Sequence, residues 1–202
     1  MPEDPRVTRS RALILAAAHD HFVAHGYVGA NVDLIAAEAG VAKRTVYNIY
    51  GGKEALFRAV VEESITIAER FSRELAAGIA AEGLEGVAVR LAGSVLGPRV
   101  LPLRRLLIGE SRRFPELAVE YYDRAPGLVM RTLAGHLRDQ PGLAVDDPQR
   151  AAEHLAFLVL GAPLDRALFD ASAVPEDLEA VALAGVAAFR RAYAAEARPA
   201  PG

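Results

Sequence analysis

Residues 35–50, IAAEAGVAKRTVYNIY, place the strongest constraint on the fold, because one glycine divides two short segments of helical spacing. Before Gly40, the side chains of Ile35, Ala36 and Ala39 fall on one face of a helix. After it, polar and basic residues alternate with apolar ones at helical spacing. Gly40 supplies the permissive backbone that a tight turn between two helices needs. The pattern therefore predicts a helix-turn-helix.

The composition favours an all-α fold. Of the 202 residues 52% are hydrophobic and only 6% aromatic, with no Trp, which favours packed helices over a β-sandwich or barrel. Pro163 is expected to kink or interrupt the helix that contains it. Apolar spacing and Gly or Pro breaks predict about nine helices, at residues 5–25 (or 8–25), 32–39, 42–49, 53–79, 85–96, 100–112, 115–139, 147–169 and 175–195.

Composition also narrows the function classes. Because Cys is absent, the chain has no disulfide framework, thiolate nucleophile or Cys-ligated metal. No stretch approaches the roughly 20 apolar residues of a membrane span, so we expect a soluble, cytoplasmic protein with no membrane partner. The formal net charge of −3 argues against a protein that coats nucleic acid, although it allows one local basic face.

The second helix of the motif is the candidate basic face. If Val46 packs beneath it, the outward residues lie at i, i+3 and i+4 positions; they are Lys43, Arg44, Tyr47 and Asn48. A short helix with such a face fits the major groove of DNA. The alternative is a helix-turn-helix retained only for packing.

Each polar residue type suggests a different contact with DNA. Arg44 pairs bidentately with guanine, Asn48 pairs with adenine, and the methyl group of Thr45 contacts thymine. Tyr47 and Lys53 suit phosphates, which fix register without reading sequence. Lys53 also opens the next helix, where the helix dipole and free N–H groups favour an anion.

The segment GYVGANVDLIAAEAGVAKRTVYNIYGGKEALF closely resembles the DNA-binding domain of the TetR-type transcriptional regulators, over about residues 10–60. The matching residues are Gly26, Tyr27, Ile35, Ala36, Ala39, Gly40, Val41, Thr45, Tyr47, Lys53, Glu54 and Leu56. The resemblance implies a homodimeric, ligand-responsive regulator, most often a repressor, that binds a near-palindromic double-stranded DNA operator. The later segment LLIGESRRFPELAVEYYDR is similar to the C-terminal domain of one branch of these regulators.

Several positions depart from the family pattern. Ala42 stands where Ser or Thr usually caps the recognition helix, a cap worth about 1 kcal/mol. Ile49 replaces a residue that is often polar, and Gly52 stands where the fourth helix usually has a polar cap. Asn31 replaces the usual Thr or Ser of the second helix but caps equally well.

The pattern suggests three regions, with boundaries at 1–52 for the DNA-binding domain, 53–196 for a helical effector-binding and dimerisation domain, and 197–202 for a disordered tail. The last two helices are Ala- and Gly-rich with wide apolar faces, which favours a four-helix dimer interface. Its candidate residues are Leu155, Leu158, Val159, Ala162, Val181, Ala184 and Ala188. The alternative is that these faces form the core of a single chain.

The resemblance implies an effector site among the helices after the fourth. Its candidate wall consists of Phe71, Leu75, Leu107, Phe114, Tyr121, Tyr122, Met130 and Phe157, with Arg104 and Glu110 as polar anchors. Aromatic residues and a Met at helical spacing also suit an ordinary core, so that alternative stays open. The chemical identity of this small molecule cannot be read from the sequence.

Catalytic and metal sites are not expected. His21 and His25 have i, i+4 spacing beside His19, but no acidic partner set shares their face. The chain has no motif for a nucleophilic triad or a phosphate-binding loop. We therefore predict no enzyme activity, no metal and no cofactor. Two other classes remain as alternatives: a helical enzyme or small-molecule carrier with a vestigial head, and a protein-interaction scaffold.

Overall fold

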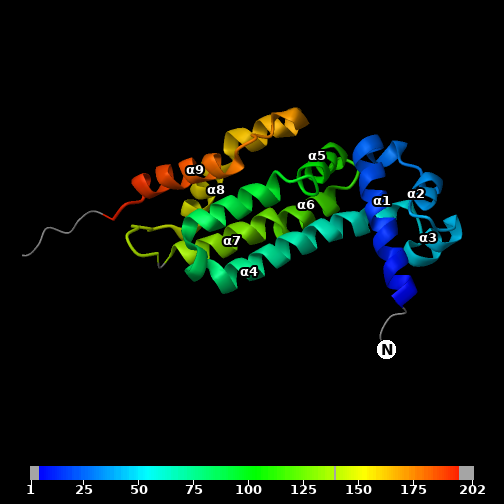
Figure 1. Cartoon of the computed structure of the whole chain (residues 1–202), viewed down its shortest axis with the longest axis horizontal. Helices are drawn as coiled ribbons and strands as arrows, with labels where there is room; N and C mark the ends of the chain where they lie inside the picture. The colour runs from blue at the N-terminus through cyan, green and yellow to red at the C-terminus, as the bar shows by residue number, and fades with distance from the viewer. Residues whose placement is uncertain (1–4, 139, 196–202) are drawn as a thin grey trace, which may run out of the picture. The chain divides into compact units, whose positions relative to one another are not determined.

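The computed structural model describes residues 5–138 and 140–195. Within these ranges it contains nine α-helices, one 3-10 turn and no β-strand (Figure 1), which confirms the predicted all-α class. No helix in the described ranges is both long and apolar enough to span a bilayer. The tail predicted at residues 197–202 lies outside the described residues. The helices are α1 (Pro5–Gly29), α2 (Val32–Glu38), α3 (Lys43–Tyr50), α4 (Lys53–Val95), α5 (Leu101–Glu110), α6 (Pro115–Arg124), α7 (Pro126–Leu137), α8 (Pro148–Phe169) and α9 (Leu178–Ala192), with the 3-10 turn η1 (Ala171–Ala173) between the last two.

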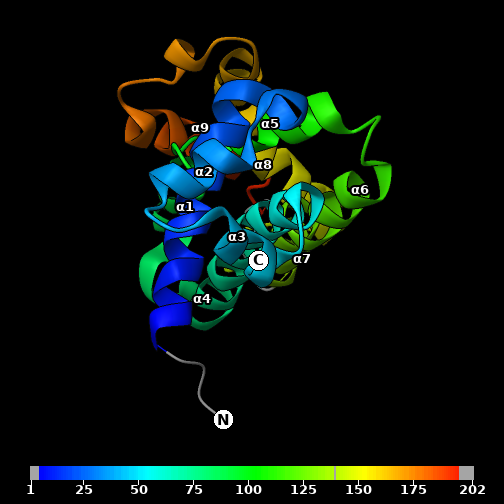
Figure 2. The same cartoon turned by 90° about the vertical axis from the view of Figure 1, so that its right-hand side faces the viewer.

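The chain divides into two units, of which the first combines the residues up to Thr66 with Pro102–Tyr121. In this unit α2 and α3 lie beside α1 (Figures 1 and 2). The helical backbone of α1 is interrupted at Gly26, whose φ of +69° suits glycine. Buried side chains of the unit include Ile14, Phe22, Ile35, Val46, Phe57, Val61 and Leu107.

An aromatic cluster joins α1 to α4 and to the start of α6 within this unit. The ring centroid of Phe57 lies 5.1 Å from that of Phe22 and 5.2 Å from those of Tyr27 and Phe114. The backbone N–H of Tyr27 donates to Oε1 of Glu110 at 3.2 Å. This carboxylate therefore binds the backbone directly after the interruption of α1.

The second unit comprises Ile67–Leu101 and the residues from Tyr122 onward. Here α7 packs on α8 and α8 packs on α9 (Figure 1). Its core includes Leu75, Val87, Leu91, Leu133, Leu155, Val159, Val186 and Phe189. The functional boundary predicted between residues 52 and 53 does not coincide with the boundary between these units, since α4 contributes to both. That functional boundary stays a prediction.

The break predicted between the segments 53–79 and 85–96 is present as a kink: both segments belong to α4, which Gly83 divides with non-helical angles of φ +67° and ψ 175°. Two details of the predicted helices were wrong. The segment 115–139 is broken at Ala125, because the residue before Pro126 disfavours helical backbone angles. Pro163 does not interrupt α8, which continues through it to Phe169. Burial of side chains on both sides of Pro163 offsets the loss of one backbone hydrogen bond.

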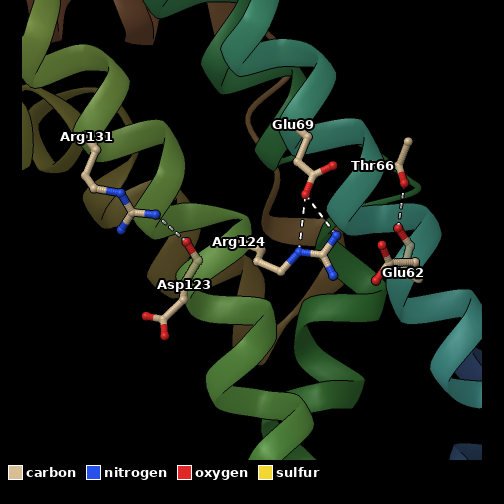
Figure 3. Close-up of polar contacts among 6 residues, drawn as sticks. All are labelled: Glu62, Thr66, Glu69, Asp123, Arg124 and Arg131. Atoms are coloured by element: carbon tan, nitrogen blue, oxygen red, sulfur yellow. Dashed lines mark hydrogen bonds and ion pairs between the residues drawn. The ribbon is translucent and has the colours of Figure 1, made fainter.

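Two arginines fix the junction between α6 and α7. The Nε and Nη2 atoms of Arg124 donate to Oε1 of Glu69 on α4 at 3.2 and 2.9 Å (Figure 3). Nη2 of Arg131 donates to the carbonyl oxygen of Asp123 at 2.8 Å (Figure 3). Basic side chains satisfy carbonyl groups that a helix end leaves free, so the short break between α6 and α7 is held in one geometry.

A bidentate ion pair ties the second half of α4 to α9 and predicts a pH effect. Arg190 donates to the two carboxylate oxygens of Glu85 at 2.8 and 3.1 Å. The hydrogen bond from Arg190 lowers the pKa of Glu85. The pair therefore contributes stability above the unfolded pKa of Glu, about 4.3, and loses it as pH falls through the lower folded value. Because both side chains are partly exposed, we expect only about 0.3–1 kcal/mol at neutral pH.

Thermal unfolding of Glu85→Gln from neutral to acidic pH checks this effect. We expect the variant to melt about 1–3 °C below the parent at neutral pH. The difference should shrink as pH falls below about 4.3 and vanish once Glu85 is protonated in the folded protein. Glu176→Gln is the control, because this exposed acid has no ion pair within the part of the chain that the structure describes. A difference that persists unchanged in acid would show that the substitution acts through packing rather than through the charge of Glu85.

Candidate nucleic-acid interface

The start of α2 is fixed by a side-chain cap. Asn31 has extended backbone angles, and its Oδ1 accepts the N–H of Asp33 at 2.8 Å. Val32, Ile35 and Ala36 are buried, so this helix presents one face to the core. The cap predicted at Asn31 is present, and it places Asp33 in the first turn of α2.

The turn between α2 and α3 follows from Gly40. This residue has a φ of +67°, a conformation that costs glycine little, and no atom lies near a Cβ placed there. The N–H of Val41 then donates to the carbonyl of Ala36 at 3.0 Å, which closes the end of α2. Ala42 precedes α3 without any side-chain hydrogen bond to the helix. The missing cap inferred from the sequence is therefore a feature of the structure.

Helix α3 presents a polar face to solvent. Val46 is fully buried beneath it, whereas the four side chains expected to project outward are exposed; they are Lys43, Arg44, Tyr47 and Asn48. Thr45 is partly buried. Gly51, with a φ of +83°, ends the helix, and its N–H donates to the carbonyl of Tyr47. The row of exposed polar groups spans almost the full length of α3.

Lys43 is not a free cation. Its Nζ lies 2.7 Å from Oδ1 of Asp33 and 5.9 Å from the centre of the Tyr47 ring. The hydrogen bond with Asp33 raises the pKa of Lys43. Sequence reasoning missed Asp33, because the two residues lie on different helices, on either side of the Gly40 turn. The available signal was an acid in the first turn of one helix of the motif and a base in the first turn of the other.

Lys53 is also engaged within the chain. Its Nζ donates to the carbonyl oxygen of Val28 at 2.9 Å and lies 5.1 Å from the centre of the Tyr27 ring. These contacts fix the last residues of α1, after the interruption at Gly26, against the start of α4. A phosphate contact by Lys53 would use the remaining donors of its ammonium group, which has three.

The residues predicted to line an effector site lie in both units. In the first unit, Leu107, Phe114 and Tyr121 are buried. Burial raises the pKa of Tyr121, and the charge of Arg104 opposes this rise. Glu110 accepts a hydrogen bond from the backbone N–H of Tyr27 and also pairs with Arg113 at 3.3 Å. Its role in the structure is therefore to join α1 to the turn before α6.

In the second unit, Phe71 and Leu75 belong to the core, and Met130 packs against it. Tyr122 is exposed, as is Phe157, whose side chain retains 76% of its accessible surface. These two therefore do not line an enclosed site within one chain. The remaining eight residues stay predictions.

The predicted dimer residues also divide into two groups. Leu155 and Val159 are buried in the core of the single chain, so they present no surface to a partner, and the prediction is corrected at these two positions. Val181 and Ala188 are partly buried. The exposed members are Leu158, Ala162 and Ala184, beside which Phe157, Phe169 and Leu183 are also exposed.

The histidines of α1 have partners other than a metal. Nδ1 of His19 lies 2.9 Å from Asp20, and Nε2 of His21 lies 2.9 Å from Glu38 on α2. His25 faces the His21 ring, with centroids 5.4 Å apart. Across the described residues, no group of three or more His, Cys, Asp or Glu side chains is arranged to hold a metal ion.

Two short helices joined by a glycine turn, the second with an exposed polar face, define a helix-turn-helix protein. Residues 14–60 match the model described as bacterial regulatory proteins, tetR family. Residues 82–195 match that of the C-terminal domain of AefR-like transcriptional repressors. The chain therefore belongs to the TetR family of bacterial regulatory proteins.

Similar proteins agree with this assignment. The structure of a TetR-family transcriptional regulator from Mesorhizobium loti is 32% identical and has a TM-score of 0.79, over 95% of this chain and 100% of that one. The flavonoid-responsive regulator FrrA is 29% identical with a TM-score of 0.66, over 94% and 100% of the two chains. The HTH-type transcriptional repressor SCO4008 of Streptomyces coelicolor is 44% identical over 62 residues, 31% of each chain. The chain thus spans about a third of the length of the curated relatives it matches.

Proposed function

We propose that this protein is a DNA-binding transcriptional repressor that acts as a homodimer in the cytoplasm and is released from its operator by a small molecule. The observation that carries the proposal is the exposed polar row of α3, which follows the Gly40 turn and rests on buried Val46. A helix of this kind reads base edges in the major groove. The proposed activity is binding rather than catalysis.

Arg44 and Asn48 are the proposed base contacts, with Thr45 second. Arg44 is exposed, and its side chain has no ion pair or hydrogen bond within the part of the chain that the structure describes, so its guanidinium is available for a guanine. Tyr47 is the proposed phosphate contact of α3. Lys53 contributes chiefly by fixing the end of α1 through Val28, and a phosphate contact is secondary.

A homodimer would use the outer faces of α8 and α9. Exposed apolar side chains gather there, including Phe157, Leu158 and Leu183, and the small residues Ala162 and Ala184 allow close approach of another helix. Two copies related by a twofold axis would place two recognition helices about 34–36 Å apart, the spacing of successive major-groove faces. Sedimentation of the purified protein tests this proposal, and a monomer at micromolar concentration would contradict it.

The proposed effector acts by population shift. A small molecule that binds better to a conformer whose recognition helices no longer match the operator lowers DNA affinity by that difference in binding energy. FrrA is flavonoid-responsive, so flavonoids are the first compounds to assay. By reciprocity, an effector that releases the operator must also bind more weakly to the DNA complex than to free protein.

Selection from a pool of random duplexes at near-physiological salt tests the DNA-binding proposal. The bound fraction is sequenced, and we expect enrichment of a twofold-symmetric site. A protein that enriches no site and loses its residual binding with added salt would not be a sequence-specific regulator. That outcome would favour a small-molecule-binding protein with a vestigial head, for which the uncapped start of α3 at Ala42 is the motivating observation.

Arg44→Ala is expected to lower affinity for the selected site by about 10- to 100-fold, since one bidentate base contact contributes about 1–3 kcal/mol of discrimination. Binding to random duplex should change far less, because that binding is electrostatic. Titration of both duplexes by fluorescence anisotropy gives the two affinities. Arg191→Ala, at the exposed end of α9, is the matched control. Equal losses on both duplexes would remove the base-reading role of Arg44.

A further inference from the structure

We propose that Asp33 limits the electrostatic affinity of the helix-turn-helix for DNA by neutralising Lys43. The proposal rests on the DNA-binding function proposed above and adds a residue that opposes binding. It implies that α3 approaches DNA with one uncompensated cation, Arg44, in place of two. The consequence is weak retention on DNA that lacks the base sequence read by α3.

The backbone of Asp33 is fixed by the local structure. Asp33 lies in the first turn of α2, where its backbone N–H is held by Asn31 at 2.8 Å. An acid in this turn also interacts favourably with the helix dipole. The backbone at Asp33 is therefore held independently of Lys43, and the carboxylate starts from a fixed point in the first turn of α2.

Lys43 is held on two sides. Its Nζ approaches Oδ1 of Asp33 to 2.7 Å, and the Tyr47 ring lies 5.9 Å from the same ammonium. The two side chains of the pair retain 56% and 57% of their accessible surface. The pair thus lies at the surface beside the exposed row of α3, where a DNA backbone would meet both charges together.

The effect on DNA follows from charge balance. Sequence-independent binding comes from lysines and arginines that neutralise phosphates and release counterions. To neutralise a phosphate, Lys43 must either leave Asp33 or divide its N–H donors between Asp33 and the phosphate. In either case the Asp33 carboxylate stays near the DNA backbone. Glu38, the other acid of α2, is paired with His21 on α1. Asp33 is therefore the acid of α2 that neutralises Lys43. Asp33 therefore subtracts about one phosphate contact from the head.

Asp33→Asn tests the inference, because it removes the charge and keeps the size of the side chain. Affinity for a random-sequence duplex is measured by fluorescence anisotropy from low to near-physiological salt. We expect binding to strengthen by about two- to fivefold and the slope of log K against log salt to steepen by about 0.9. Asp33→Glu, which keeps the charge, should restore the parent affinity and slope.

Two further variants separate this charge effect from others. Glu38→Gln makes the same change in net charge on the same helix but leaves the Asp33–Lys43 pair intact, so its salt slope should match the parent. Lys43→Gln combined with Asp33→Asn should abolish the gain. Circular dichroism melts of each variant establish that it is folded.

An Asp33→Asn variant that is folded and binds no more tightly than the parent overturns the inference, as does an equal gain from Glu38→Gln. Neither outcome affects the proposed function, because the random-duplex assay needs no operator. Failure of the parent to bind any DNA at low salt would instead reject the proposed function itself.

Discussion

Phe57→Ala is expected to lower the free energy of unfolding by about 3–5 kcal/mol. Phe57 has 0% of its surface exposed, and its ring contacts three other aromatic rings, those of Phe22, Tyr27 and Phe114. Its removal would leave a cavity where α1, α4 and the start of α6 meet, and it would also remove edge-to-face ring interactions. Chemical denaturation followed by circular dichroism measures the loss.

Leu34→Ala is the control in the same unit. Leu34 lies on α2 with 56% of its surface exposed, so the change should stay within about 0.5 kcal/mol. If Phe57→Ala cost no more than this control, the ring cluster would contribute little to holding the unit together. The contacts of Tyr27 with Glu110, Phe114 and Arg113 would then hold α1 to the turn before α6.

The helix-turn-helix could be predicted from the sequence because its determinants are local. Gly40 fixes the turn, Asn31 caps α2, and the spacing around Val46 sets which side chains of α3 face outward. Each of these depends on residues within one or two helical turns. The orientation of the exposed row therefore follows from periodicity alone.

The partners of the basic side chains of this unit could not be predicted in the same way. The contacts of Lys43 with Asp33 and of Lys53 with Val28 join different helices, and periodicity within one helix does not pair them. For the same reason the apolar positions of α8 were assigned to a dimer surface, although Leu155 and Val159 face the core. A pattern of apolar residues gives the width of a face but not which neighbour covers it.

The predictions of helix breaks were wrong where two structural effects oppose each other. The helical spacing across residues 115–139 is continuous, but Pro126 excludes helical angles at Ala125. At Pro163 the opposite occurred, because buried neighbours on α8 keep the helix intact despite the proline. The outcome at each proline depends on the packing around it, which becomes known only with the tertiary structure.

Gly185→Ala is expected to destabilise the protein by about 1–3 kcal/mol, although alanine favours a helix. A Cβ at position 185 of α9 would lie 2.6 Å from the carbonyl oxygen of Leu158 and 2.9 Å from Cα of Val159 on α8. Both are backbone atoms, so the two helices must separate to admit the methyl group. Their separation would also disturb the exposed faces proposed to form the dimer.

Gly135→Ala makes the same chemical change on α7 with no atom within 4 Å of the new Cβ. It should stabilise the protein by about 0.5–1 kcal/mol, because alanine loses less backbone entropy in a helix than glycine. Thermal unfolding gives both effects, and sedimentation gives the change in self-association. A gain in stability for both variants would mean that α8 and α9 yield to the methyl group at no cost. Opposite signs instead establish that close backbone contact, rather than helix propensity, selects glycine at position 185.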